Sequence, residues 1–164
     1  MKTLLLLRHA KASRTSPTGQ DIDRPLVEEG RADAPLVGQR LRREQLTPDA
    51  IICSSAIRAQ QTIALVIEAA HLTTRPRIEP RIFEASAGRL LDVVSEVEAG
   101  AQTLLVVGHI PGLEQLIERL TGASVSMSPA TLARIDLDIK EWGEAFTAAG
   151  RLAFALPPEA SEDN

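Results

Sequence analysis

Two polar side chains stand together where the first apolar run of the chain ends. Leu4–Leu7 is followed at once by Arg8 and His9. In open α/β sheets, ligands bind outside the carboxyl ends of the strands, so this is where we expect chemistry. A guanidinium matches phosphate oxygens in charge and geometry, and an imidazole can act as a base or as a nucleophile.

Two later strand-like runs end in residues of the same kinds. The second predicted strand is followed by Ser54, Ser55 and Arg58, where either serine can cap the next helix, and the fourth is followed by His109. In a parallel sheet these ends face the same way, and two arginines, two histidines and two helix N-termini then converge. Such a place favours a doubly charged anion, and a histidine held there could accept a phosphoryl group.

The elements that would position these residues alternate between strand and helix. We predict strands at Thr3–Leu7, Ala50–Cys53, Thr103–Val107, Thr131–Leu137 and Arg151–Leu156, with a weaker one at Arg77–Ile82, and helices at Glu28–Gln45, Ile57–His71, Ala87–Ala99 and Pro111–Thr121. The alternation indicates an α/β fold: a three-layer sandwich with a mostly parallel central sheet and helices on both faces. The last two strands have no full crossover helix between them, which allows an antiparallel strand at the edge.

Two of the helical patterns carry a further expectation. Pro35 lies inside the first pattern and is expected either to mark a late first turn or to kink the helix. In the second pattern, five residues recur at the spacing of one helix face: Ile57, Gln61, Ala64, Leu65 and Glu68.

Length and composition predict one domain. The chain has 164 residues, which fits a domain over residues 1–156 followed by a polar, acidic and disordered tail at 157–164. The net charge of −4 argues against a general nucleic-acid surface, and the four leucines before Arg8 are too few for a signal peptide. No apolar stretch approaches the roughly 18 residues of a membrane span. Cys53 is the only cysteine, so no intramolecular disulfide can form, and we expect a cytoplasmic protein.

Three segments resemble the signature blocks of the histidine phosphatase superfamily, which has the phosphoglycerate mutase-like fold. The segments are Leu7–Ala12, Ser54–Thr62 and Val107–Pro111. The Arg-His-Ala-Lys sequence of the first block and the segment Asp21–Leu26 are similar to the SixA-type phosphohistidine phosphatases. The resemblance runs from Thr3 to about Leu156, with the three blocks in the family's order.

The resemblance implies a role for each matching residue. His9 would be the nucleophile that becomes phosphohistidine, and Arg8 and Arg58 would bind the phosphoryl oxygens. His109 would complete the pocket, contact the phosphoryl group and stabilise the transition state. No cofactor and no metal is implied. A metal held by His9, His109 and a carboxylate is disfavoured because the two arginines would repel a cation.

The general acid is where this chain departs from the family pattern. Mutases and acid phosphatases of the superfamily place a carboxylate after the third strand or beside the second histidine. Here Ile110 follows His109, and Glu84 is the nearest match, either as an acid or as a plain surface residue. Asp21 and Arg24 match a family segment near the pocket mouth, where they would bind substrate or simply lock the loop.

The resemblance therefore implies a phosphatase with a covalent phosphohistidine intermediate, acting on phosphohistidine in a protein. Imidazole leaves more readily than an alkoxide, so a weak or missing acid fits this substrate class. One alternative is a phosphomonoesterase of the same superfamily that acts on a small phosphate ester. Another is a non-catalytic phosphate-binding module. Neither a nucleic acid nor a membrane is expected as a partner.

Overall fold

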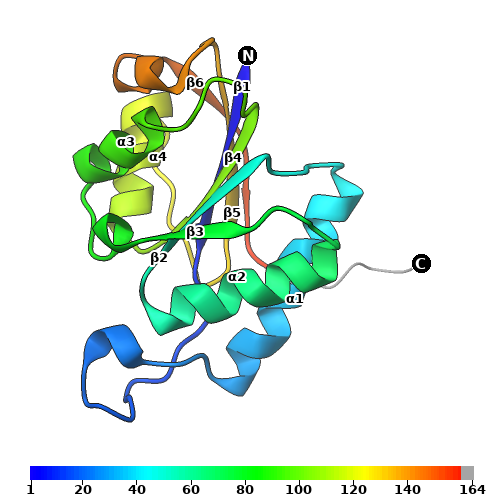
Figure 1. The fold of residues 1–164 in the computed structure, drawn as a ribbon, viewed down its shortest axis with the longest axis vertical. Coiled ribbons are helices and arrows are strands. Elements are labelled where there is room, and N and C mark those ends of the chain that lie inside the picture. The colour runs from blue at the N-terminus through cyan, green and yellow to red at the C-terminus, as the bar shows by residue number, and fades with distance from the viewer. Residues whose placement is uncertain (160–164) are drawn as a thin grey trace.

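The computed structural model describes residues 1–159 and contains one six-stranded sheet in the order β3-β2-β4-β1-β5-β6 (Figure 1). The strands are β1 (Lys2–Arg8), β2 (Ala50–Ser54), β3 (Pro76–Glu79), β4 (Thr103–Gly108), β5 (Leu132–Leu137) and β6 (Gly150–Leu156). The α-helices are α1 (Glu28–Arg43), α2 (Ile57–Ala70), α3 (Ala87–Ser95) and α4 (Gly112–Thr121). Three short 3₁₀ helices lie at Asp21–Asp23, Pro80–Ile82 and Trp142–Phe146.

The sheet is mostly parallel, with antiparallel pairing on one side. Strands β1, β2, β3 and β4 run in the same direction, whereas β5 pairs antiparallel with both β1 and β6. The predicted antiparallel strand near the edge is thus confirmed, and it is β5, one place inside the edge strand β6. In the centre, Arg8 is paired with Gly108 and Cys53 with Val107, so β1, β2 and β4 end at the same edge of the sheet.

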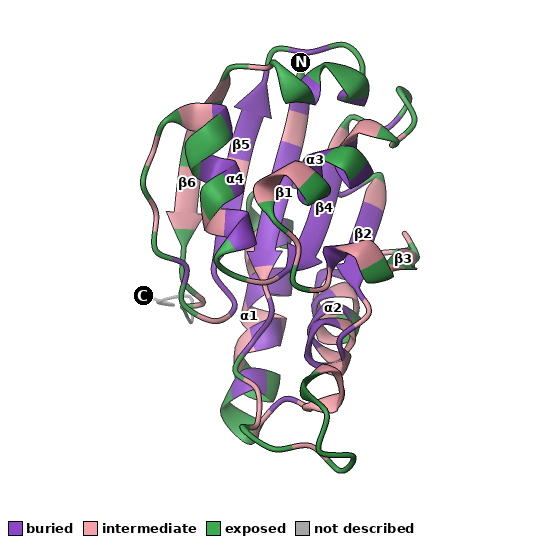
Figure 2. Cartoon of the chain, turned by 90° about the vertical axis from the view of Figure 1, so that its left-hand side faces the viewer, coloured by how far each residue is buried: buried purple, intermediate pink, exposed green. Residues whose placement is uncertain are grey.

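Helices cover both faces of the sheet, which confirms the three-layer architecture (Figures 1 and 2). Alternate leucines of β1 point to opposite faces, as the pleat of a strand requires. Leu5 and Leu7 belong to the core under α1 and α2, whereas Leu4 and Leu6 belong to the core under α3 and α4. The central strands are therefore apolar on both faces, and Figure 2 shows them almost wholly buried.

Two predicted segments end three or more residues earlier in the structure than expected. The weak strand 77–82 divides at Pro80, because the proline has no N–H for the sheet and opens a 3₁₀ helix instead. The helix predicted to reach Ala99 stops at Ser95. Beyond it, the ammonium group of buried Lys2 donates to the carbonyls of Ala99 and Ala101, which holds this segment as a turn.

The second helix buries a different face from the predicted one. Its buried side chains are Arg58, Ala59, Thr62, Ile63, Val66 and Ala70. The predicted face was wrong, because α2 is apolar on more than one side and its partners decide which side is covered. In α1, the helix starts at Glu28 and continues through Pro35, which excludes the first of the two alternatives expected for this proline, a late first turn.

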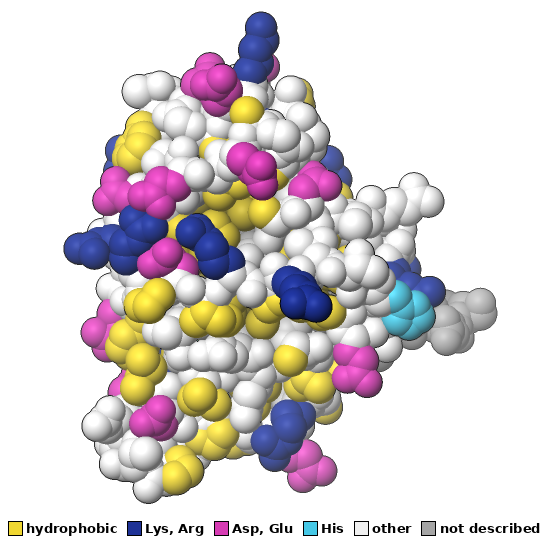
Figure 3. All heavy atoms as spheres, viewed as in Figure 1, with side chains coloured by type: hydrophobic (Ala, Val, Ile, Leu, Met, Phe, Trp, Pro, Cys, Tyr) yellow, Lys and Arg dark blue, Asp and Glu magenta, His cyan; other side chains and the backbone are white. Residues whose placement is uncertain are grey.

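On the face shown in Figure 3, acidic and basic side chains are interspersed rather than gathered by sign.

None of the helices in residues 1–159 combines the length and the apolar character that a membrane span requires. Of the predicted tail 157–164, residues 160–164 lie outside the described residues.

Candidate active site

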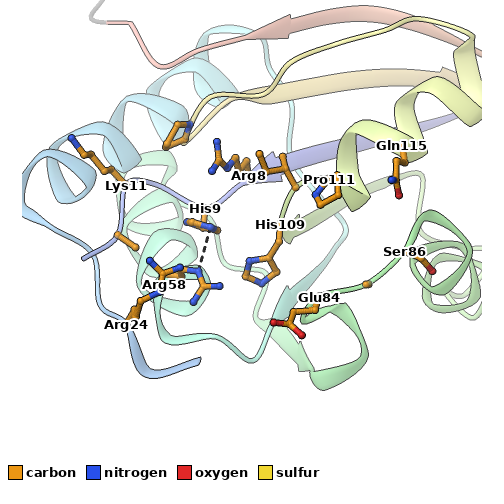
Figure 4. A pocket seen from close by; sticks show the side chains of 14 residues that line it. Arg8, His9, Lys11, Arg24, Arg58, Glu84, Ser86, His109, Pro111 and Gln115 are labelled. Carbon is orange, nitrogen blue, oxygen red and sulfur yellow. Dashed lines mark hydrogen bonds between the residues drawn. The ribbon is translucent and has the colours of Figure 1, made fainter. Parts of the chain in front are cut away.

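A cavity of about 530 Å³ lies where β1, β2 and β4 end (Figure 4). The four residues that the sequence placed at three separate strand ends all line it: Arg8, His9, Arg58 and His109. The convergence expected from a parallel sheet is thus what the structure shows. Arg24 and Glu84 also line the cavity, whereas Asp21 does not.

His9 follows β1 directly and is held through both ring nitrogens. Nδ1 lies 2.7 Å from the carbonyl oxygen of Ala10, and because a carbonyl can only accept, Nδ1 carries the proton. Nε2 accepts a hydrogen bond of 3.3 Å from Nε of Arg58. Burial, and after it the nearby charges of Arg58 and Arg8, lowers the pKa of His9 to about 4, despite the opposing Ala10 bond. At neutral pH the ring is therefore uncharged, with its lone pair on Nε2.

Arg58, in the first turn of α2, is a buried cation with an ordered guanidinium. Nη1 donates to the carbonyl oxygen of Asp21 at 2.8 Å, and Nη2 donates to its carboxylate at 3.1 Å. The guanidinium also lies 5.8 Å from the centre of the Phe83 ring. With one N–H directed to His9, Arg58 keeps two N–H groups of its five for a ligand.

Arg8, the last residue of β1, lines the cavity from another side. Nη1 donates to the carbonyl oxygen of Met127 at 2.8 Å, while the buried Nε has no hydrogen-bond partner within residues 1–159. Glu114 accepts the N–H of Met127 at 2.7 Å, so a carboxylate on α4 steadies the segment that holds Arg8. A buried N–H without a partner is costly, which makes this N–H an exception among the polar groups of the site.

His109 follows β4 and lies with its ring centre 5.2 Å from that of His9. Its Nε2 is 2.8 Å from the hydroxyl oxygen of Ser54, and the ring meets Phe83 edge-on at 5.6 Å. Burial, followed by the proximity of His9 and Arg58, lowers the pKa of His109 to about 3. Both histidines are thus neutral at pH 7, and the arginines carry the positive charge of the site.

Of the remaining predicted residues, Glu84 and Arg24 line the cavity, and Asp21 binds two of the arginines that do. Glu84 is exposed and has a left-handed backbone with φ 55°, which is uncommon for a residue other than glycine. Asp21 accepts hydrogen bonds from both Arg24 and Arg58, which are the contacts of a loop-locking residue. Arg24 also donates to the carbonyl oxygen of Ser13 at 2.9 Å.

Sequence reasoning missed three side chains around the site: Ser54, Thr62 and Phe83. Ser54 was expected at most as a helix cap, but the N-cap of α2 is Ala56, and Ser54 binds His109. Ser54 and Thr62 lie in the second signature block, so their presence was visible, whereas their partners, which follow β4 and β1, were not. Nothing in the sequence around Phe83 indicated its contacts with His109 and Arg58.

The donor set of the cavity suits an anion. Two guanidinium groups with free N–H groups face a small space between two neutral imidazoles, and arginine binds phosphate oxygens in this way. Among the residues that the structure describes, no group of three or more histidine, cysteine, aspartate or glutamate side chains is placed to hold a metal ion.

Comparisons with known proteins agree with this geometry. Residues 4–99 match the model of the histidine phosphatase superfamily (branch 1). An uncharacterized protein of Mycobacterium tuberculosis is 37% identical over 128 residues, which are 77% of this chain and 76% of that protein. A putative phosphohistidine phosphatase SixA from Nakamurella multipartitia has a TM-score of 0.86 and 28% identity over 97% of both chains. The ecdysteroid-phosphate phosphatase of Drosophila melanogaster is 37% identical over 73 residues, 43% of this chain and 10% of that protein.

Proposed function

The chain belongs to the histidine phosphatase superfamily, and on this premise we propose that it removes the phosphoryl group from phosphohistidine in a protein, with His9 as the nucleophile. Its family and its structural neighbours support phosphatase activity. One observation carries the mechanism: Ala10 holds the proton of His9 on Nδ1, which leaves the lone pair of Nε2 beside Arg58 in the cavity.

In the first step, Nε2 of His9 attacks the phosphorus atom. The bond between phosphorus and the substrate imidazole breaks, and its electron pair stays on the leaving nitrogen, which takes a proton from solvent. Arg8 and Arg58 neutralise the charge on the equatorial oxygens while the phosphoryl group passes between the two nitrogens. In the tautomer whose Nε2 accepts the hydroxyl proton of Ser54, Nδ1 of His109 carries the ring proton and can donate it to a phosphoryl oxygen.

In the second step, water attacks the phosphorus of phosphorylated His9. The bond from phosphorus to Nε2 breaks, its electron pair returns to the ring, and inorganic phosphate leaves with the oxygen of the water. The hydrogen bond from Nδ1 to Ala10 persists through both steps and stabilises the partial positive charge that the ring carries while it is phosphorylated.

The surroundings of the cavity favour a protein side chain as the substrate. Only residues 109–111 connect β4 to α4, and only residues 55–56 connect β2 to α2. These two loops are too short to cover the cavity. The relative from Nakamurella multipartitia is described as a putative phosphohistidine phosphatase. A phosphoramidate also has a leaving group that needs little help from an acid, which suits a cavity whose lining carboxylate, Glu84, is exposed.

Glu84 gives the competing function its support. A carboxyl group at the cavity can, in its protonated form, donate a proton to an alkoxide, which a small phosphate ester requires and a phosphohistidine does not. The relative from Drosophila melanogaster is a phosphatase for an ecdysteroid phosphate, a small molecule. A small-molecule phosphomonoesterase is therefore the second candidate, with the same nucleophile and the same arginines.

A matched substrate panel separates the two candidates. Values of kcat/KM are compared for a phosphohistidine peptide and for a series of sugar phosphates and alkyl phosphates at one pH. The spontaneous hydrolysis of phosphohistidine is subtracted with the His9→Ala variant. We expect the peptide to have the largest kcat/KM. If a small phosphate ester exceeds it, the protein substrate is wrong and the second candidate replaces it.

A further inference from the structure

Thr62 has a buried hydroxyl group that forms hydrogen bonds with the backbone of two segments of the site, the one after β1 and the first turn of α2. It lies in α2 one turn after Arg58 and is fully buried. Its Oγ1 accepts the N–H of Ala10 at 3.0 Å and donates to the carbonyl oxygen of Arg58 at 2.7 Å. One hydroxyl thus ties the segment after β1 to the helix that carries Arg58.

Ala10 forms hydrogen bonds with both Thr62 and His9 and so links the two residues. Its N–H is held by Thr62, and its carbonyl oxygen is the acceptor for Nδ1 of His9. From the other direction, Arg58 donates to Nε2 of the same ring. The two nitrogens of His9 are therefore oriented by two groups whose backbones meet at Thr62.

We propose that Thr62 is the positioning residue of the nucleophile: it fixes Ala10 and so keeps His9 in the tautomer with its proton on Nδ1 and its lone pair on Nε2. The inference rests on the proposed role of His9. Without the hydroxyl, the buried N–H of Ala10 has no acceptor, and the backbone must turn to find one. The carbonyl of Ala10 then leaves Nδ1, and only the 3.3 Å hydrogen bond from Arg58 to Nε2 still favours the productive tautomer.

A threonine hydroxyl in a helix often donates to the carbonyl four residues earlier, so that bond alone indicates no role in function. The chain contains a matched control for this point. Thr121, at the end of α4, donates to the carbonyl oxygen of Ile117 at 2.7 Å and accepts the N–H of Ala123 at 3.1 Å. Both threonines make the same pair of bonds, but Thr62 alone holds a residue that contacts His9.

The test compares Thr62→Val, Thr62→Ser and Thr121→Val with the wild type. Valine keeps the shape of threonine and removes the hydroxyl, and serine keeps the hydroxyl. Three quantities are measured: the single-turnover rate of phosphoryl transfer to the enzyme, KM, and the proton position on His9 by ¹⁵N NMR of the imidazoles. Thermal unfolding reports whether each variant is folded.

For Thr62→Val we expect a transfer rate lower by up to about 100-fold, a nearly unchanged KM and a mixture of His9 tautomers. Thr62→Ser should keep the Nδ1–H tautomer and a rate near that of the wild type, and Thr121→Val should alter neither. A folded Thr62→Val protein with the wild-type tautomer and rate overturns the proposal. So does a Thr62→Ser protein as impaired as Thr62→Val.

The wild type gives a test that does not depend on any variant folding. Its His9 must carry the proton on Nδ1 at neutral pH, and a proton on Nε2 overturns the inference. The two proposals also fail separately. If the wild type never becomes phosphorylated while Thr62→Val still changes the tautomer, the nucleophilic role of His9 is wrong and the positioning role of Thr62 is supported.

Discussion

At the scale of single residues, the site depends on a histidine that is kept neutral between two cations. Burial and the charges of Arg58 and Arg8 disfavour the imidazolium form of His9, and its pKa falls to about 4. A neutral imidazole is the form that attacks phosphorus, so the arginines that would bind the phosphoryl oxygens also prepare the nucleophile. The same neighbours keep His109 neutral.

The role considered for Glu84, as the acid that protonates the leaving group of a phosphate ester, is tested by substitution. We expect Glu84→Gln to lower kcat for an alkyl phosphate by at least about 100-fold, the lower end of what general acid catalysis contributes. The rate with phosphohistidine should stay nearly unchanged, since imidazole needs no such help. Steady-state kinetics on both substrates measures the difference.

Glu114→Gln serves as the control for this substitution, because it also removes one carboxylate, and Glu114 does not line the cavity. It should affect the two substrates to the same extent. Equal losses with Glu84→Gln on both substrates, or no loss on either, would contradict the role of Glu84 as a selective acid.

Three of the residues that sequence reasoning found share one property: each stands at the end of an apolar run. Arg8, His9 and His109 stand directly after the runs that precede them, so their convergence followed from the parallel sheet alone. Thr62 and Ser54 could not be assigned in this way. Their partners, Ala10 and His109, are distant in sequence, and only the packed structure brings them within hydrogen-bond distance.

At the scale of elements, the position of α2 depends on a close approach to α1. Gly38 lies at the contact, where an added Cβ atom would come within 2.6 Å of the carbonyl oxygen of Val66 and 2.9 Å of the N atom of Ala70. These are backbone atoms, which cannot rotate away. The missing side chain therefore sets the distance between the two helices, and α2 carries Arg58 and Thr62.

Gly38→Ala should destabilise the protein, although alanine is the better helix former by about 1 kcal/mol. We expect the free energy of unfolding to fall by about 1–3 kcal/mol, because the helices must separate. Gly88, in α3, is the control: the nearest atom to its added Cβ is a side-chain oxygen at 3.9 Å. Urea unfolding should show Gly88→Ala unchanged or more stable. Equal stability of the two variants would refute the close-packing argument.

Strands with a continuous apolar run were predicted well, whereas the buried face of a helix was predicted poorly where the helix is apolar on more than one side. For the four leucines of β1, no buried face has to be chosen, because both faces of that strand are buried. In α2, Ile57 and Leu65 recur at helical spacing as well as Ile63 and Val66 do, and the sequence offers no means of choosing between them. The packing of α1 selects the second pair.

At the scale of the molecule, two buried histidines make stability depend on pH. In the folded protein the pKa of His9 is about 4 and that of His109 about 3, against about 6.5 in an unfolded chain. Between these values the unfolded chain binds more protons than the folded one. Stability is therefore complete above pH 6.5 and is lost as the pH falls through the window from 6.5 to about 3.

The expected loss across this window is on the order of a few kcal/mol for the two histidines together. The free energy of unfolding is measured by urea titration at pH 7.0, 5.5 and 4.5. His9→Asn and His109→Asn should each flatten the dependence. If both variants lose stability in parallel with the wild type, the histidines are not buried in their neutral forms.

The architecture could be predicted from the alternation of strands and helices and from the apolar, buried strands. The order of the strands in the sheet could not. Alternating strands and helices predict a parallel sheet with helices on both faces, and the structure has this form. The order β3-β2-β4-β1-β5-β6 places the first strand beside the fourth, a choice made by packing over the whole chain. That choice brings Arg8 level with Gly108 and so places His9 beside His109.

Direct trapping of the phosphorylated enzyme tests the nucleophilic role of His9. The protein is incubated with a phosphohistidine peptide labelled in its phosphoryl group and quenched in alkali, and the label is located by peptide mapping. We predict label on His9 that is stable in alkali and lost in acid, together with no label on the His9→Ala variant. A wild-type protein that hydrolyses the peptide without taking up label, or a His9→Ala variant that takes up as much, would contradict the mechanism.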